Sequence, residues 1–360
     1  MPSIALGRSD VIVGVDTHKD EHVAFAIDGL GGTLGDPLFV PASPDGYADL
    51  LAWADSLGAI YAFGVEGCGS YGCGLARFLR RQDQKVFEVA RPRRTDRRLS
   101  GKSDTLDAER AARSVLSGTG NATPKLADGK IEAIRLIKIA RDTAVKAHTA
   151  TLITLKAVLV TASDELRGRL EALTDHKLVV ASAAFETQES VSDPEAAMRH
   201  VLSHLARRWL DLHEEIKVHS SHLKILTKAV APQMLERFGI GFDTAAELLI
   251  TAGDNSERIR SEAAFAKMCG VCPIPTGSGK SSGRHRLNRG GNRQANAALH
   301  RVVIARMQWH APTIAYFARR TADGLSKKDV IRCLKRFVAR EIYSLLPGTS
   351  NSSESGELAA

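Results

Sequence analysis

The chain has 360 residues, a formal net charge of +8, 44% hydrophobic residues and 5% aromatic residues. This length exceeds one ordinary domain, and the apolar content permits more than one buried core. The positive charge favours an anionic partner, whereas the scarcity of aromatic side chains argues against a protein that binds single strands by stacking on their bases. Double-stranded DNA and structured RNA are therefore the favoured partners.

The sequence also has features of a chain that stays in the cytoplasm. It shows no apolar run that is long enough for a membrane helix, no signal peptide at its start and no pairing pattern among its five cysteines. We expect a cytoplasmic, nucleoid-associated protein without a membrane partner.

The first 116 residues alternate between apolar strands and helical segments. Strands are predicted at residues 11–16, 22–28, 37–40, 60–66 and 85–90. Ser43 and Pro44 open one helix, and another begins near Ser103. This order predicts an α/β domain like that of ribonuclease H.

Four acidic residues fall at related places on these elements. Asp16 and Glu66 each end a predicted strand, while Asp104 and Asp107 lie three apart and so share one helix face. Clustered carboxylates repel one another unless a cation lies among them, and hard oxygen ligands suit Mg²⁺. The pattern predicts a magnesium site that would clamp a scissile phosphate. The alternative is a local structural role for each acid, such as that of Asp104 near a helix N-terminus.

A basic segment directly precedes the two aspartates of the helix. Residues 91–102 include Arg97, Arg98 and Lys102. We interpret them as contacts to a nucleic-acid backbone beside the metal site, with a solvated basic face as the alternative.

A second group of polar residues lies at 269–296, where no strand or long helix is expected. Gly277 and Gly279 flank Ser278 and allow a sharp turn that exposes its hydroxyl, which makes this serine a candidate nucleophile. The segment also contains arginines that could hold phosphates, namely Arg286, Arg289 and Arg293. A nucleotide-binding P-loop is rejected because Ile274 stands where its first glycine belongs.

These motifs together resemble the DEDD-type insertion-sequence transposases, described as bridge-RNA-guided serine recombinases. The resemblance spans nearly the whole chain and rests on six segments: GVDTHKD, GVEGCGSYG, KSDTLDAERAA, GIGFDTAAELL, CGVCP and RGGNRQAN. It implies a RuvC-like domain that binds Mg²⁺ through Asp16, Glu66, Asp104 and Asp107. It also implies a C-terminal transposase domain whose serine forms a phosphoserine link to DNA.

The resemblance further implies a composite active site, in which the carboxylates of one subunit join the serine of another. The implied assembly is a homodimer or tetramer that holds a structured non-coding guide RNA and two double-stranded DNAs, the element ends and the target. Family members carry two adjacent serines, and Gly277 occupies the first of these positions here, while Ser278 matches the second. Ser282 is the alternative nucleophile.

The segment 236–249 resembles a helix-hairpin-helix, whose glycine turn offers backbone amides to a phosphate. Gly239 and Gly241 would then contact the DNA backbone. An ordinary turn between two helices explains them equally well.

Residues 129–230 have apolar side chains at helical spacing and predict long helices that form a coiled-coil connector and support subunit contact. The predicted organisation is α/β plus all-α. Its segments are a RuvC-like domain at 8–125, the connector at 129–230, a mainly helical transposase domain with the serine loop at 231–346, and a disordered tail at 347–360.

Two other functions stay open. One is a metal-dependent nuclease like a junction resolvase, in which water attacks and the serine loop only binds DNA. The other is a non-catalytic nucleic-acid-binding protein, which would be expected to have lost the serine or some of the acids, whereas all five residues are present.

Overall fold

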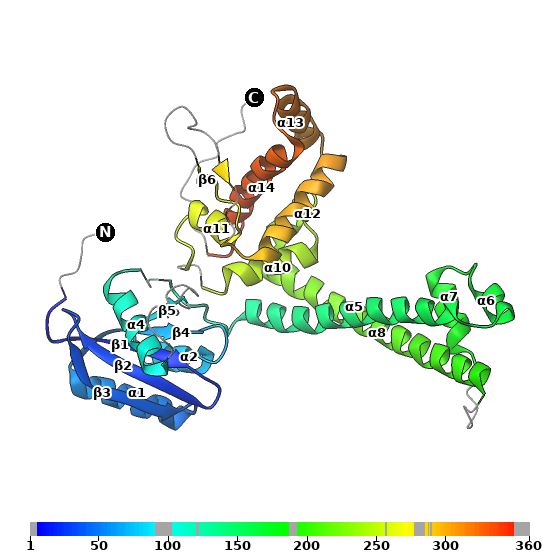
Figure 1. The fold of residues 1–360 in the computed structure, drawn as a ribbon. Coiled ribbons are helices and arrows are strands. Elements are labelled where there is room, and N and C mark those ends of the chain that lie inside the picture. The colour runs from blue at the N-terminus through cyan, green and yellow to red at the C-terminus, as the bar shows by residue number, and fades with distance from the viewer. Residues whose placement is uncertain are drawn as a thin grey trace. The chain divides into compact units, whose positions relative to one another are not determined.

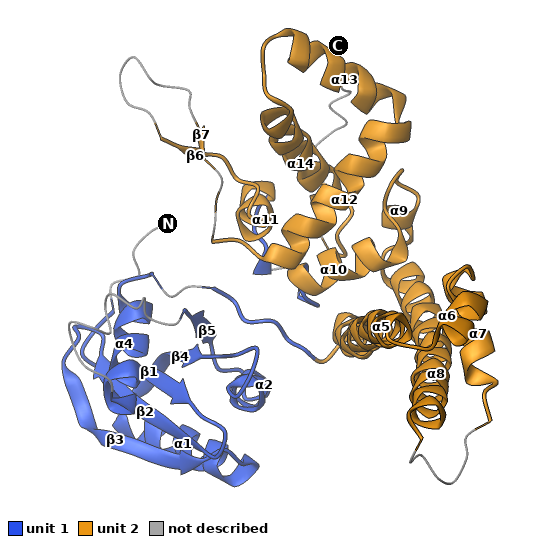
Figure 2. Ribbon diagram, turned by 45° about the vertical axis from the view of Figure 1, so that its right-hand side comes forward, with its two compact units in different colours: residues 1–127, 252–261 blue, residues 128–251, 262–360 orange. Residues whose placement is uncertain are grey.

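The computed structural model describes residues 6–90, 103–119, 122–186, 193–255, 258–276, 285–286, 288 and 290–348. The chain forms two compact units (Figure 2). Unit 1 comprises residues 1–127 and 252–261, and unit 2 comprises residues 128–251 and 262–360. Most of the tail for which disorder is predicted, residues 349–360, lies outside the described residues.

Unit 1 contains a five-stranded mixed sheet with helices on both faces (Figure 1). The strand order is β3-β2-β1-β4-β5, in which β1 pairs antiparallel with β2 and parallel with β4. This ribonuclease-H-like arrangement confirms the predicted α/β domain. The strands are β1 Asp10–Thr17, β2 Glu21–Asp28, β3 Thr33–Pro41, β4 Ala59–Glu66 and β5 Val86–Val89, and the helices are α1 Pro44–Leu57, α2 Cys73–Arg81 and α4 Asp104–Leu116.

Successive side chains of a strand point to opposite faces of the sheet, so the core of unit 1 has two layers, one on each face. Val11, Val13 and Val15 of β1 pack in the layer that α1 and α2 complete. Ile12 lies on the opposite face, in the layer that α4 covers through Ala108 and neighbouring alanines. Side chains of β1 and β4 that point to the same face of the sheet as Ile12 therefore face α4.

Unit 2 begins with a long helical hairpin (Figure 1). α5, Lys130–Val160, runs out to two short helices, α6, Asp164–Leu170, and α7, Asp175–Ala183, and α8, Pro194–Val230, runs back along it. Leu155 and Leu159 of α5 pack against Leu202 and Trp209 of α8. The predicted long helices are confirmed, whereas α6 and α7 are an addition.

One expectation about α5 is corrected. Its most apolar 18-residue window has a mean hydropathy of 1.2, so by length and composition alone α5 could cross a membrane, although sequence inspection found no such span. One such helix is weak evidence for a membrane span, and α5 forms ion pairs within its own unit. Lys138 forms an ion pair of 2.8 Å with Asp243 of helix α10, Phe242–Ala252, and Arg141 forms one of 3.0 Å with the same carboxylate.

The remainder of unit 2 is mainly helical, as predicted. Its helices are α9 Pro232–Leu235, α10 Phe242–Ala252, α11 Glu262–Met268, α12 Arg293–Trp309, α13 Ala311–Ala322 and α14 Lys327–Tyr343. The expectation of no strand in 269–296 is wrong, because Ile274–Pro275 (β6) and His285–Arg286 (β7) form a short antiparallel ladder. Backbone pairing at two positions closes this ladder without any apolar alternation that a sequence would reveal.

Candidate functional site

The four predicted acidic ligands lie where β1 and β4 end. These strands are parallel neighbours with Val15 paired to Val65, so Asp16 and Glu66 leave the sheet side by side at its carboxyl edge. The strand order reverses between β1 and β4, and ligands of α/β sheets bind at such a switch point. Asp16 follows Ile12 by four residues in the same strand, so both side chains lie on the face of the sheet that α4 covers.

A pair of glycines brings α4 onto these strands. Gly14 of β1 is paired with Gly64 of β4. A Cβ atom on Gly14 would lie 2.0 Å from the carbonyl oxygen of Ala108, and one on Gly64 would lie 2.6 Å from a methyl group of Val115. The helix backbone therefore rests directly on the sheet, which places the first turn of α4, with Asp104 and Asp107, beside the strand ends.

Asp16, His18 and Asp104 form the most compact part of the site. His18 Nε2 lies 3.2 Å from Asp16 Oδ2 and 3.5 Å from Asp104 Oδ1, and the ligand atoms of all three residues lie within 4.8 Å of one another. Sequence reasoning missed His18. The signal available was its place in the GVDTHKD segment two residues after Asp16, before the turn in which the His18 amide donates to the carbonyl of Glu21.

Glu66 and Asp107 lie outside this compact group of three ligands and are almost fully buried. Both line a cavity of about 410 Å³, together with Arg110 of α4. Arg110 Nη1 donates to Asp107 Oδ1 over 2.9 Å, and Thr17 Oγ1 donates to the backbone carbonyl of Glu66 over 2.8 Å. The cavity lining thus combines two carboxylates with two arginines, Arg110 and Arg113.

Electrostatics favour a cation at this edge. Burial raises the pKa of Asp16 above its ordinary value of 3.8; His18 lowers it in part, and the charges of Asp107 and Asp104 raise it again. A divalent ion would relieve this repulsion, because opposite charge favours the ionised carboxylate. The donor set of carboxylate oxygens and one imidazole nitrogen fits such an ion.

Comparison with known proteins agrees with this geometry. Residues 13–163 match a family model described as a DEDD transposase of the IS110 type, and residues 233–318 match the model of the transposase IS116/IS110/IS902 family. Both regions of the chain are thus similar to transposases of the IS110 family. A relative from Streptomyces coelicolor, an uncharacterised 43.6 kDa protein of insertion element IS110, is 27% identical over 165 residues, which are 45% of this chain and 40% of that protein.

Of the residues predicted to contact nucleic acid, only some lie in the part of the chain that the structure describes. Arg286 lies exposed in β7 and Arg293 lies exposed at the first position of α12. Asn292 caps that helix by accepting from the amide of Gln294 over 2.8 Å. The other predicted basic contacts and both candidate nucleophiles fall outside the described residues, namely Arg97, Arg98, Lys102, Arg289, Ser278 and Ser282.

The turn between α9 and α10 contains the two predicted backbone contacts. Gly239 has a φ of 79°, a left-handed conformation that favours glycine, and Gly241 is exposed just before α10. Arg306 of α12 donates to the carbonyl of Phe238 over 2.9 Å and is paired with Glu341. Arg306 of α12 therefore stabilises this turn, and the contact of the turn with DNA stays a prediction.

Proposed function

We propose that the protein is a DNA transposase that cuts and joins DNA through a serine nucleophile, with the carboxylate cluster holding Mg²⁺ at the same phosphate. The observation that carries this proposal is the close group of Asp16, His18 and Asp104 at the end of β1 and the start of α4, with the buried carboxylates of Glu66 and Asp107 on the same elements. The comparisons support it, since residues 13–163 and 233–318 both match transposase families.

In the proposed reaction, Ser278 Oγ attacks the phosphorus of a DNA phosphodiester. A bond forms between Oγ and phosphorus, the bond to one deoxyribose oxygen breaks, and that oxygen takes up a proton as the leaving group. Asp16, Asp104 and His18 would hold the ion, and Glu66 and Asp107 would complete its site. When bound, a divalent ion supplies positive charge beside the phosphate.

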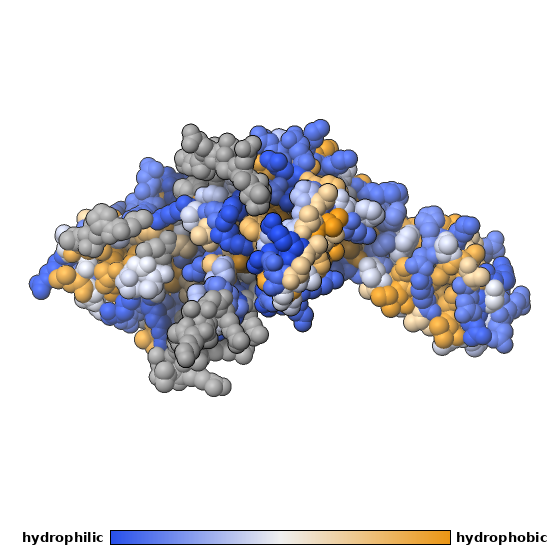
Figure 3. Space-filling model, turned by 90° about the horizontal axis from the view of Figure 1, so that it is seen from above, coloured by the Kyte–Doolittle hydropathy of each residue, from blue (hydrophilic) through white to orange (hydrophobic). Residues whose placement is uncertain are grey.

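The proposal includes a structured guide RNA and a homo-oligomer, in which the cluster of one subunit meets the serine of another. The net charge of +8 and the family resemblance support an RNA partner. Exposed apolar side chains on the helical hairpin support subunit contact, among them Ile153, Val160 and Val180. Apolar patches on the surface of the hairpin are visible in Figure 3.

A covalent trapping experiment tests the proposal. Purified protein is incubated with Mg²⁺, the RNA encoded beside its gene and labelled element-end DNA, and the products are separated on a denaturing gel. We expect a protein–DNA adduct with the wild type and none with Ser278→Ala. Ser282→Ala serves as the matched control and should retain the adduct.

Two outcomes would change the reading. Loss of the adduct in Ser282→Ala alone would transfer the nucleophile to Ser282. Metal-dependent cutting that persists in both variants, without any adduct, would favour the nuclease in which water attacks. Asp107→Asn should abolish product formation in either case, because it removes a buried ligand of the cluster.

A further inference from the structure

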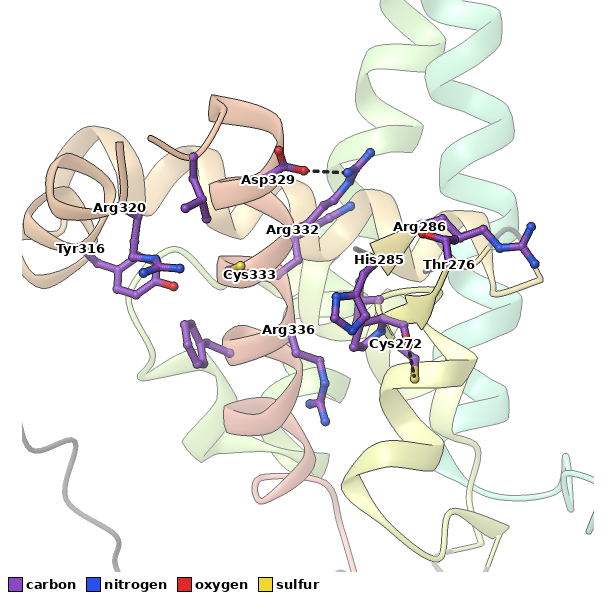
Figure 4. Close-up of a pocket in the computed structure, with 15 residues that line it drawn as sticks. Cys272, Thr276, His285, Arg286, Tyr316, Arg320, Asp329, Arg332, Cys333 and Arg336 are labelled. Atoms are coloured by element: carbon purple, nitrogen blue, oxygen red, sulfur yellow. Dashed lines mark hydrogen bonds and ion pairs between the residues drawn. The ribbon is translucent and has the colours of Figure 1, made fainter. Parts of the chain in front are cut away.

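A second cavity, of about 790 Å³, lies within unit 2 (Figure 4). Tyr316 and Arg320 of α13 line one side, Arg332 and Arg336 of α14 line the middle, and the β6–β7 ladder lines the other side with His285. Its volume falls within the range of about 300–1,000 Å³ that is usual for sites of small organic ligands. A nucleotide fits such a volume, whereas a duplex does not.

The cavity lining is strongly cationic. The described residues that line it include five cations, Arg286, Arg320, Arg332, Lys335 and Arg336, and Asp329 alone is acidic among them. Asp329 pairs with Arg332 over 2.8 Å, Asp323 pairs with Arg320 over 2.9 Å, and Glu262 pairs with Arg336. No carboxylate partner is found for Arg286 or Lys335 among the described residues, so these two side chains supply the positive charge that an anionic ligand would neutralise.

Lys335 is the most informative of these cations, because it is only 8% exposed. Its Nζ donates to Asn296 Oδ1 over 2.7 Å, and no carboxylate partner is found for it among the residues that the structure describes. Burial lowers the pKa of Lys335, and the charge of Arg332 lowers it further. An anion in the cavity would offset both effects.

Asn296 gives Lys335 a fixed position. The Asn296 amide donates to the carbonyl of Cys269 over 3.0 Å and to that of Gly270 over 3.2 Å. A Cβ atom on Gly291 would lie 2.2 Å from the amide nitrogen of Gly270, so the two turns pack backbone to backbone. The CGVCP and RGGNRQAN segments thus jointly orient a lysine at the cavity.

The cavity also has an aromatic wall. The rings of Tyr316 and Phe337 lie 5.5 Å apart at an angle of 89°, and Phe337 is 41% exposed. An aromatic face next to cations is the combination that binds a nucleobase and its phosphate. In addition, Pro275 pairs with His285 in the ladder beside this cavity. These two residues flank the segment that contains Ser278 in the sequence.

We propose that the cavity binds one unpaired nucleotide of a DNA strand, with its phosphate against Lys335 and Arg332 and its base against Tyr316 and Phe337. The choice of DNA rests on the proposed function, since the strand that reaches Ser278 is the substrate. Extruding a nucleotide from the stack into the cavity would hold the neighbouring phosphodiester beside the β6–β7 ladder.

Photocrosslinking of the full-length protein tests this site. The probe is a single-stranded oligodeoxynucleotide with one 5-iodouracil, bound in EDTA so that no cutting is needed, and crosslinks are located by mass spectrometry. We expect crosslinks at Tyr316 or Phe337. Lys335→Met should weaken binding about tenfold, equivalent to one lost charged contact, while Lys328→Met on the exposed side of α14 should bind as the wild type does.

A double variant, Tyr316→Leu with Phe337→Leu, gives an independent test if Lys335→Met fails to fold, and it should lose the crosslink while binding persists. Crosslinks that map elsewhere at saturating probe, or unchanged binding by folded Lys335→Met, would overturn the proposal. A crosslink with the matching RNA probe but not with DNA would overturn the assignment to DNA. Crosslinking does not need the serine, so retention in Ser278→Ala separates this site from failure of the proposed chemistry.

Discussion

Replacing Gly14 with alanine tests how the sheet positions the metal site. The new Cβ atom would lie 2.0 Å from the carbonyl oxygen of Ala108 and 2.3 Å from the amide nitrogen of Ala112. Both atoms belong to the backbone of α4, so no side-chain rotation relieves the clash. Since a carbon and an oxygen rarely approach closer than about 3 Å, α4 must move away by about 1 Å.

This displacement carries Asp104 and Asp107 away from Asp16 and Glu66. We expect a loss of about 1–3 kcal/mol in the free energy of unfolding from overpacking. A misplacement of about 1 Å at a catalytic site costs roughly 100-fold in rate. DNA cutting should fall by that factor, and the rise in Tm that Mg²⁺ or Mn²⁺ gives the wild type should shrink.

Thermal unfolding with and without metal, followed by the cutting assay, measures both effects. Gly168→Ala is the matched control, because a Cβ atom at Gly168 meets nothing within 4 Å and helix α6 should gain slightly in stability. A Gly14→Ala protein with wild-type Tm and wild-type metal response would refute the reasoning, because α4 would then not rest on Gly14.

Two further predictions concern side chains that the structure brings together. His18→Ala should weaken Mn²⁺ binding about tenfold, measured by metal-dependent thermal shift, whereas a lost ligand without effect would remove His18 from the site. Asp243→Asn should cost about 1–3 kcal/mol at neutral pH. Burial raises the pKa of Asp243, but the hydrogen bond from Lys138 and the charges of Lys138 and Arg141 outweigh it, so the pKa lies below 3.8 in the folded chain. The stabilisation is therefore complete above that value and is lost as the pH falls through the lowered pKa. Urea unfolding at neutral pH and at about pH 3 checks this, with exposed Asp164→Asn as control; an equal cost of Asp243→Asn at both pH values would contradict it.

The local patterns of the sequence predicted much of unit 1. Apolar runs that end on Asp16 and Glu66 gave the two central strands, and the spacing of Asp104 and Asp107 gave one face of α4. The long helices of unit 2 followed from apolar periodicity. These features depend on interactions between near neighbours in the chain, which a single sequence displays.

Contacts between distant residues were decided only by the tertiary structure. His18 joined the cluster because it lies in the turn that follows β1, and Lys335 of α14 donates to Asn296 of α12, in the RGGNRQAN segment. The two-residue ladder of β6 and β7 carries no periodic signal in the sequence. The close packing of α4 on the sheet depends on Gly14 and Gly64, which are neighbours only because β1 and β4 pair in this register. The sequence by itself determined the elements and the chemistry available, whereas packing chose which of those groups meet, because that choice depends on long-range geometry that no local pattern encodes.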